Sequence, residues 1–298
     1  MTSLSSSIYN HRLENGRTYH RYKEGKYQYP NDERENDRLD LQHELCLITL
    51  DHKLGLAPPN EEDSKVKRVL DLGTGTGLWA IEFGETHPDA EVCRNTVTLS
   101  IPRVPPNVVF EVDDIEEPWT YSQPFDYIHS RLMTSSISQW KPYLQKCFNN
   151  LTPGGYFELF ESGSGLRADD DTLKEDSVIV TSGKLFNEAL AKLGRPFQEI
   201  PELVDIMNEI GFVDIVVTKY KWPMNQWPKD PTHKLIGAWS LQNNLDGIEG
   251  WFMAGFTRAL GWKKEEVQVL LVDLRKELKD TSIHAYMPIY AIYGRKPE

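Results

Sequence analysis

The chain has 298 residues, which is enough for one α/β domain that carries insertions. Hydrophobic residues make up 39% and charged residues 26%, and these proportions exclude a disordered or membrane-embedded chain. The formal net charge of −12 argues against a protein that binds nucleic acid or anionic membrane through its overall field. We therefore expect neither nucleic acid nor membrane as a partner.

The cysteines and the start of the chain bear on its compartment. Cys46, Cys93 and Cys147 lie far apart without CxxC spacing, so neither a disulfide framework nor a zinc site is indicated. The start has no basic region followed by a long apolar stretch, and no later segment has the apolar length that spans a bilayer. We expect a cytoplasmic protein, and the sequence leaves the nucleus open as well.

The first part of the chain, residues 1–60, is expected to form an N-terminal cap segment and a helix. Its tyrosines, among them Tyr22 and Tyr27, make it too aromatic for a plain disordered tail. Asn31-Asp32 offers a helix cap, and the leucines that follow predict a helix ending near Gly55.

From residue 61 onward, strands and helices alternate, which implies a largely parallel sheet covered by helices on both faces. Strands are predicted at residues 67–72, 90–93, 108–112, 125–130, 156–160, 213–220 and 284–293. Helical insertions are expected at about 166–198 and 226–280. The prediction is an α/β, Rossmann-like fold with a seven-stranded, mostly parallel sheet, in which residues 61–298 and the cap form a single structural unit.

A glycine-rich loop follows the first of these strands and leads straight into a helix, as Asp71-Leu72-Gly73-Thr74-Gly75-Thr76-Gly77. Glycines accept positive φ and let a ligand lie against the main chain. The carboxylate of Asp71 would repel a pyrophosphate, but it would tolerate a zwitterionic amino acid that carries a cationic sulfonium. The alternative is a tight turn that needs glycines for its geometry alone.

Six segments carry a resemblance to a known family: YQYPND at 27–32, DRLDLQH at 37–43, VLDLGTGTGLWAIEF at 69–83, VPPNVVFEVDDIEEPW at 104–119, FDYIHSR at 125–131 and LTPGGYFELFE at 151–161. In these segments the chain resembles the class I S-adenosylmethionine-dependent methyltransferases, and more narrowly the fungal LaeA-like group associated with secondary metabolism. S-adenosyl-L-methionine is therefore the implied cofactor.

The resemblance also implies which residues bind the cofactor. They are Tyr22, Asp71, Gly73, Thr74, Gly75, Gly77, Thr96, Asp113, Asp114, Ile115, His129 and Ser130. The glycine loop would hold the methionine and ribose parts, Asp114 would meet the adenine amino group, and Tyr22 would belong to the cap. His129 and Ser130 end the fourth strand, where open parallel sheets bind ligands, and should border the methyl group.

One position departs from the family pattern. Members usually end the second strand with an acid that binds both ribose hydroxyls, whereas Thr96 stands there in this chain. A hydroxyl lacks the bidentate, charged acceptor pair of a carboxylate. We expect weakened cofactor affinity, or substitution by Glu91.

The catalytic candidates are His129 and Glu161, which would deprotonate or orient the methyl acceptor. The alternative is that both residues have only structural roles. His129 would then be a packed or surface histidine, and Glu161 would be a carboxylate that caps local structure. Positioning does most of the work in an in-line methyl transfer, and no metal is demanded.

The predicted function is O- or N-methylation of a small molecule, in particular a secondary metabolite. One alternative is a regulatory or scaffold protein with little turnover, acting with a protein partner. Another is a cofactor-bound cyclase or isomerase.

Overall fold

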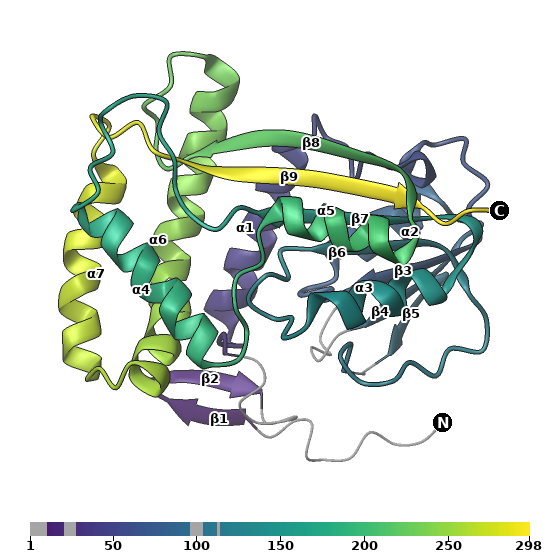
Figure 1. Ribbon diagram of the computed structural model, residues 1–298, viewed down its shortest axis with the longest axis horizontal. Coiled ribbons are helices and arrows are strands. Elements are labelled where there is room, and N and C mark those ends of the chain that lie inside the picture. Colours follow the sequence, from purple (N-terminus) through teal and green to yellow (C-terminus); the bar gives the residue numbers. More distant parts are fainter. Residues whose placement is uncertain (1–10, 21–27, 96–103, 112–113) are drawn as a thin grey trace. The chain divides into compact units, whose positions relative to one another are not determined.

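The computed structural model describes residues 11–20, 28–95, 104–111 and 114–298 (Figure 1). The chain divides into two compact units: one comprises residues 1–45, 165–197 and 221–288, and the other comprises residues 46–164, 198–220 and 289–298. The first unit thus groups the N-terminal segment with the two helical insertions. The division at residue 60 into a cap and one further domain stays a prediction. No helix within the described ranges is long and apolar enough to cross a membrane.

The second unit is built on a seven-stranded sheet with the order β5-β4-β3-β6-β7-β9-β8 (Figure 1). The strands are β3 (Arg68–Leu72), β4 (Glu91–Asn95), β5 (Val108–Glu111), β6 (Phe125–Arg131), β7 (Leu151–Ser162), β8 (Val213–Pro223) and β9 (Tyr286–Arg295). β3 to β7 pair in parallel, and β9 is antiparallel to β7. The predicted Rossmann-like α/β fold with a mostly parallel sheet is confirmed.

Neighbouring residues of the central strands face opposite sides of this sheet, as the period of two in a strand requires. Val69 and Tyr127 pack with α2 (Leu78–Thr86) on one face. The next residue of each strand, Leu70 and Ile128, packs on the other face. The helices on that face are α3 (Trp140–Asn149) and α5 (Ile200–Ile210). Both faces are buried, which explains why these strands read as continuous apolar runs.

A buried carboxylate fastens the chain where it enters the sheet. Glu158 of β7 is 1% exposed. It accepts hydrogen bonds from the backbone N–H groups of Leu56 at 2.7 Å and Ala57 at 2.9 Å. It also accepts from the Tyr127 hydroxyl at 2.8 Å and the Asn60 amide at 3.2 Å. The short helix η2 (Pro58–Asn60) belongs to this clamped segment.

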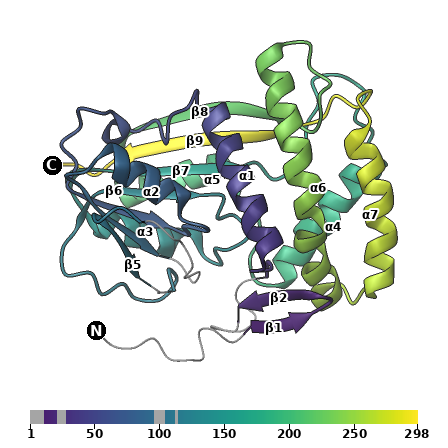
Figure 2. The ribbon, with the colours of Figure 1, turned by 180° about the vertical axis from the view of Figure 1, so that it is seen from behind.

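The first unit contains a helical bundle and a small hairpin. The helices α4 (Val178–Lys192), α6 (Pro231–Ala259) and α7 (Lys264–Lys279) pack on one another (Figure 2). Phe252 and Phe256 fill their common core. The hairpin pairs β1 (His11–Glu14) with β2 (Arg17–His20) around Asn15-Gly16, whose φ angles are 52° and 88°.

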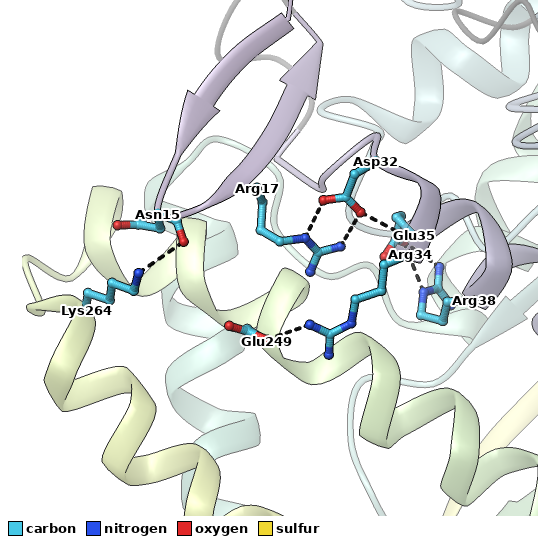
Figure 3. Close-up of polar contacts among 8 residues, drawn as sticks. All are labelled: Asn15, Arg17, Asp32, Arg34, Glu35, Arg38, Glu249 and Lys264. Carbon is cyan, nitrogen blue, oxygen red and sulfur yellow. Dashed lines mark hydrogen bonds and ion pairs between the residues drawn. The ribbon is translucent and has the colours of Figure 1, made fainter.

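Ion pairs tie the N-terminal segment together and to α6 (Figure 3). Arg17 holds both carboxylate oxygens of Asp32, at 2.6 Å for Nη2 and Oδ1. Asp32 precedes α1 (Glu33–Thr49) and accepts the N–H of Glu35 at 3.1 Å, which caps this helix. Arg38 in turn donates to Glu35 at 2.7 Å and to Asn243 of α6 at 2.8 Å. The predicted Asn31-Asp32 cap therefore also anchors the hairpin.

The Glu158 clamp gives a stability prediction. Glu158→Ala leaves buried backbone N–H groups without an acceptor, so the free energy of unfolding should fall by about 3 kcal/mol. Urea unfolding monitored by circular dichroism measures the change. The control is Glu209→Ala, which removes an exposed carboxylate paired with Lys141 and should alter the free energy by no more than about 0.5 kcal/mol. Equal losses in the two variants would contradict the clamp.

Candidate cofactor site

The candidate site lies at the carboxyl ends of β3 and β6. Asp71 is opposite His129 in the register of these strands, and Leu72 is opposite Ser130. The chain leaves β3 toward β4 on one side and reaches β6 on the other, so the strand order reverses here. Open α/β sheets bind their ligands at such a point, because the two neighbouring connections diverge to opposite faces.

Asp71 and His129 form a buried pair at this edge. Both are 2% exposed, and His129 Nδ1 lies 2.8 Å from Asp71 Oδ1. The imidazole stacks on the Trp79 ring with 3.8 Å between centroids and 4° between planes. Asp71 Oδ2 is also buried, yet no described residue donates a hydrogen bond to it. A buried carboxylate oxygen without a donor is costly, and a cationic or N–H-bearing group beside it would satisfy it.

The glycine loop closes a tight turn after Asp71. The Thr74 hydroxyl donates to the Asp71 carbonyl at 3.0 Å, and the Gly77 N–H donates to the Thr74 carbonyl at 3.0 Å. Gly73, Gly75 and Gly77 have φ angles of 68°, 59° and 90°. α2 starts directly after Gly77, so its N-terminal N–H groups open onto the loop.

Gly73 has a second reason to be glycine. A Cβ atom at this position would lie 2.3 Å from Met133 Sδ, far inside van der Waals contact. Met133 follows β6 and is itself buried. The loop therefore packs its main chain directly against a thioether from the neighbouring connection.

Glu161, near the end of β7, is 0% exposed. Its oxygens accept the backbone N–H of Met133 and the hydroxyl of Thr134. Burial raises the pKa of Glu161 to about 7, although these hydrogen bonds act to lower it. To deprotonate an acceptor, this carboxylate would have to leave partners that it already holds. Its predicted role as a base stays a prediction.

The other predicted cofactor residues divide into those that the structure describes and those that lie outside the described ranges. Ser130 is buried, and its hydroxyl accepts from Tyr143 at 2.7 Å. The Asp114 carboxylate accepts the N–H of Glu116 at 2.9 Å, and Ile115 packs against the core on the α3 side. Three predicted cofactor residues, Tyr22, Thr96 and Asp113, lie outside the described residues, as does Tyr27.

One expectation is wrong. Glu91 cannot take the place of the second-strand acid, because it begins β4 rather than ending it. It is opposite Arg68 in the register and forms an ion pair with that residue at 3.3 Å, whereas Asp71 is opposite Arg94. Along β4, Glu91 lies three residues before Arg94, the residue opposite Asp71, and three residues of strand span about 10 Å.

Sequence reasoning missed two residues of the site. Trp79 covers His129, and its position in the first turn of α2, four residues before Phe83, is a signal that this helix face is buried. Met133 contacts Gly73 through the fold alone, and no spacing in the sequence points to it.

The fold and this edge define a class of protein: a doubly wound α/β domain with an acid and a glycine loop at the switch point. The family described as "Methyltransferase domain" matches residues 40–216. The chain belongs to this family and is a class I S-adenosylmethionine-dependent methyltransferase, EC 2.1.1.-. The resemblance stated from the sequence motifs is confirmed.

Several fungal relatives match nearly the whole chain. Methyltransferase pytC of Aspergillus terreus is 39% identical over 99% of this chain and 91% of its own. Probable methyltransferase tdiE of Emericella nidulans is 36% identical over 88% and 82%. Secondary metabolism regulator LAE1 of Cochliobolus heterostrophus is 35% identical over 96% and 95%.

A solved structure supports the fold alone. The YcgJ protein from Bacillus subtilis aligns with a TM-score of 0.50 at 16% identity, over 86% of this chain and 99% of its own. The doubly wound sheet is thus shared by a chain of very different sequence.

The Gly73 packing predicts a loss of ligand binding. Gly73→Ala strains the backbone and displaces Met133, so affinity for S-adenosylhomocysteine should fall about tenfold or more, measured by isothermal titration calorimetry. The matched control is Gly194→Ala, where φ is 75° but no atom lies within 4 Å of the added Cβ. This control carries the same backbone strain and should bind normally. Equal affinities in the two variants would show that the packing is irrelevant.

Proposed function

We propose that the glycine loop binds S-adenosyl-L-methionine and that the chain transfers its methyl group to an oxygen or nitrogen of a small molecule of secondary metabolism. The observation that carries this proposal is Asp71 Oδ2, a buried acceptor that no described residue satisfies. The ammonium group of the cofactor's methionine part would supply the missing donor.

The relatives support the class of acceptor. Two of them, pytC and tdiE, are named as methyltransferases, and LAE1 is named as a regulator of secondary metabolism. The net charge of −12 favours a small acceptor over a nucleic acid. The oxygen or nitrogen that accepts the methyl group stays a prediction.

The cofactor supplies a methyl group on a cationic sulfur, which makes the transfer a direct displacement. The protein's part is to align the methyl group with the acceptor atom. Holding two reactants in the correct geometry can by itself lower the activation barrier substantially. The Asp71–His129 hydrogen bond and the Trp79 stack fix one wall of the site. We propose that Asp71, Gly73, Thr74, Gly75 and Gly77 hold the cofactor, with His129 and Ser130 beside the methyl group and Asp114 and Ile115 on the adenine side.

A second candidate function is regulatory. The chain is 35% identical to LAE1 and 31% identical to Secondary metabolism regulator laeA of Emericella nidulans. A protein that binds the cofactor, turns over little and acts with a protein partner would fit these names.

The cofactor assignment is tested with Asp71→Asn. The amide keeps the shape but loses the charge that holds an ammonium group, so S-adenosylmethionine affinity should fall about tenfold or more in calorimetry. Asp89→Asn is the control, because its side chain is 89% exposed and its ion-pair partner among the described residues is Lys67. Failure of the parent protein to bind at millimolar cofactor would refute the assignment.

The acceptor is tested by incubating the protein with a fungal extract and methyl-labelled cofactor, followed by mass spectrometry. Labelled small molecules are the expected result. Label on a protein would instead match the relative named Protein-methionine methyltransferase laeA, which is 31% identical. Bound cofactor with no labelled product, together with a stable partner on pull-down, would favour the regulator. A new product of unchanged mass would favour a cyclase or isomerase.

A further inference from the structure

We infer that Glu161 is a positioning residue: it holds Met133 against Gly73 and so sets the conformation of the glycine loop that receives the cofactor. This inference rests on the proposed function for its effect on cofactor binding, and on the described contacts for its mechanism. It assigns Glu161 a task different from proton transfer.

The first step runs from Glu161 to the turn after β6. Glu161 Oε1 accepts the backbone N–H of Met133, and Oε2 accepts the hydroxyl of Thr134. Both oxygens of a wholly buried carboxylate are thus engaged by consecutive residues of one turn. Met133 and Thr134 are themselves buried, so their donors would have no water to bond if this acceptor were lost, and the carboxyl group therefore holds the turn firmly.

The second step is the conformation of that turn. Leu132 has a φ of 53°, which is strained for a side chain of its size, and its N–H donates to the Phe160 carbonyl at 2.8 Å. The Met133 carbonyl accepts from Ser136 at 2.7 Å and from Ile137 at 3.1 Å. Met133 is therefore fixed at its N–H and at its carbonyl. Such strain persists only where the surroundings over-determine the backbone.

The third step runs from Met133 to the loop. Its side chain belongs to the core cluster that includes Leu72, and its sulfur lies where a Cβ of Gly73 would be. Methionine has a flexible side chain, and its buried neighbours in this cluster keep the thioether on Gly73 only while the backbone of Met133 stays in this position. Fixing the backbone of Met133 keeps the thioether on Gly73, and this contact limits the conformations open to the loop.

The unfavourable desolvation of the Glu161 carboxyl group is consistent with a role in positioning Met133. Desolvation raises the pKa of Glu161 to about 7, which means that burial disfavours the charged form of this carboxyl group. Replacing buried ionic groups with apolar ones is often neutral or stabilising, so stability alone does not require this carboxylate. A requirement for one turn geometry beside the cofactor loop does explain it.

The test compares Glu161→Gln, Glu161→Ala, Met133→Ala and the double variant Glu161→Ala/Met133→Ala. Glutamine keeps an oxygen for the Met133 N–H, and the Thr134 hydroxyl can turn to accept from its amide. We expect Glu161→Gln to keep more S-adenosylmethionine affinity than Glu161→Ala, because it retains an acceptor for the Met133 N–H. Glu161→Ala and Met133→Ala should each weaken affinity about tenfold, and the double variant should be no weaker than the worse single variant.

The small molecule that becomes labelled in the extract experiment supplies a second readout, because its KM should stay unchanged in Met133→Ala while the cofactor Kd rises. A catalytic base behaves differently: Glu161→Gln and Glu161→Ala would lose kcat by the same factor, and Met133→Ala would be additive with them. Either of these results would overturn the inference.

A readout without cofactor separates this inference from the proposed function. Amide hydrogen exchange of residues 73–77 in the ligand-free protein should speed up in Glu161→Ala and in Met133→Ala, but not in Glu161→Gln. Thr134→Val, which removes only the hydroxyl, should give an intermediate rate. Unchanged exchange in Glu161→Ala would refute the positioning role even if the cofactor binds, and increased exchange would support it even if the cofactor does not.

Discussion

The buried carboxylate of Asp71 at the end of β3 is the constraint on which the site depends. A charge in the interior must be compensated, and the parallel register brings His129 of β6 opposite it to do so. The imidazole can serve Asp71 only in one orientation, and the stack on Trp79 maintains that orientation. The start of α2, which carries Trp79, is in turn set by the glycine loop that follows Asp71.

Among the described residues, three buried acids stand on β3 and β7, and their hydrogen bonds distinguish their tasks. Glu158 is occupied by the segment that enters the sheet, and Glu161 is occupied by the turn after β6. Of these three acids, only Asp71 keeps a buried oxygen that no described residue satisfies. A fully satisfied acid holds the chain in place, whereas an acid with a spare buried oxygen has binding energy left for a ligand.

The sequence predicts those parts of the fold and site whose signal is local. The strand that contains Asp71 is an apolar run, and the loop after it is marked by glycines. The β1–β2 hairpin was not predicted although Asn15-Gly16 is a strong turn signal, because its two four-residue strands are short and mostly polar and lack the alternation typical of a strand. β7 also begins earlier than predicted: Pro153-Gly154-Gly155 looks like a stop, but a register irregularity lets the strand include it.

The contact between Met133 and Gly73 had no local signal, since it joins two connections that meet only after the sheet forms. Contacts of this kind also fix the two residues that were predicted as bases. Glu161, whose pKa lies near neutrality, is committed to hydrogen bonds within the protein, and His129 is committed to Asp71 and Trp79. Both residues predicted to move protons therefore make hydrogen bonds within the protein. A displacement at a methyl group needs an aligned nucleophile more than it needs a base, so rigidity at this edge serves the reaction directly.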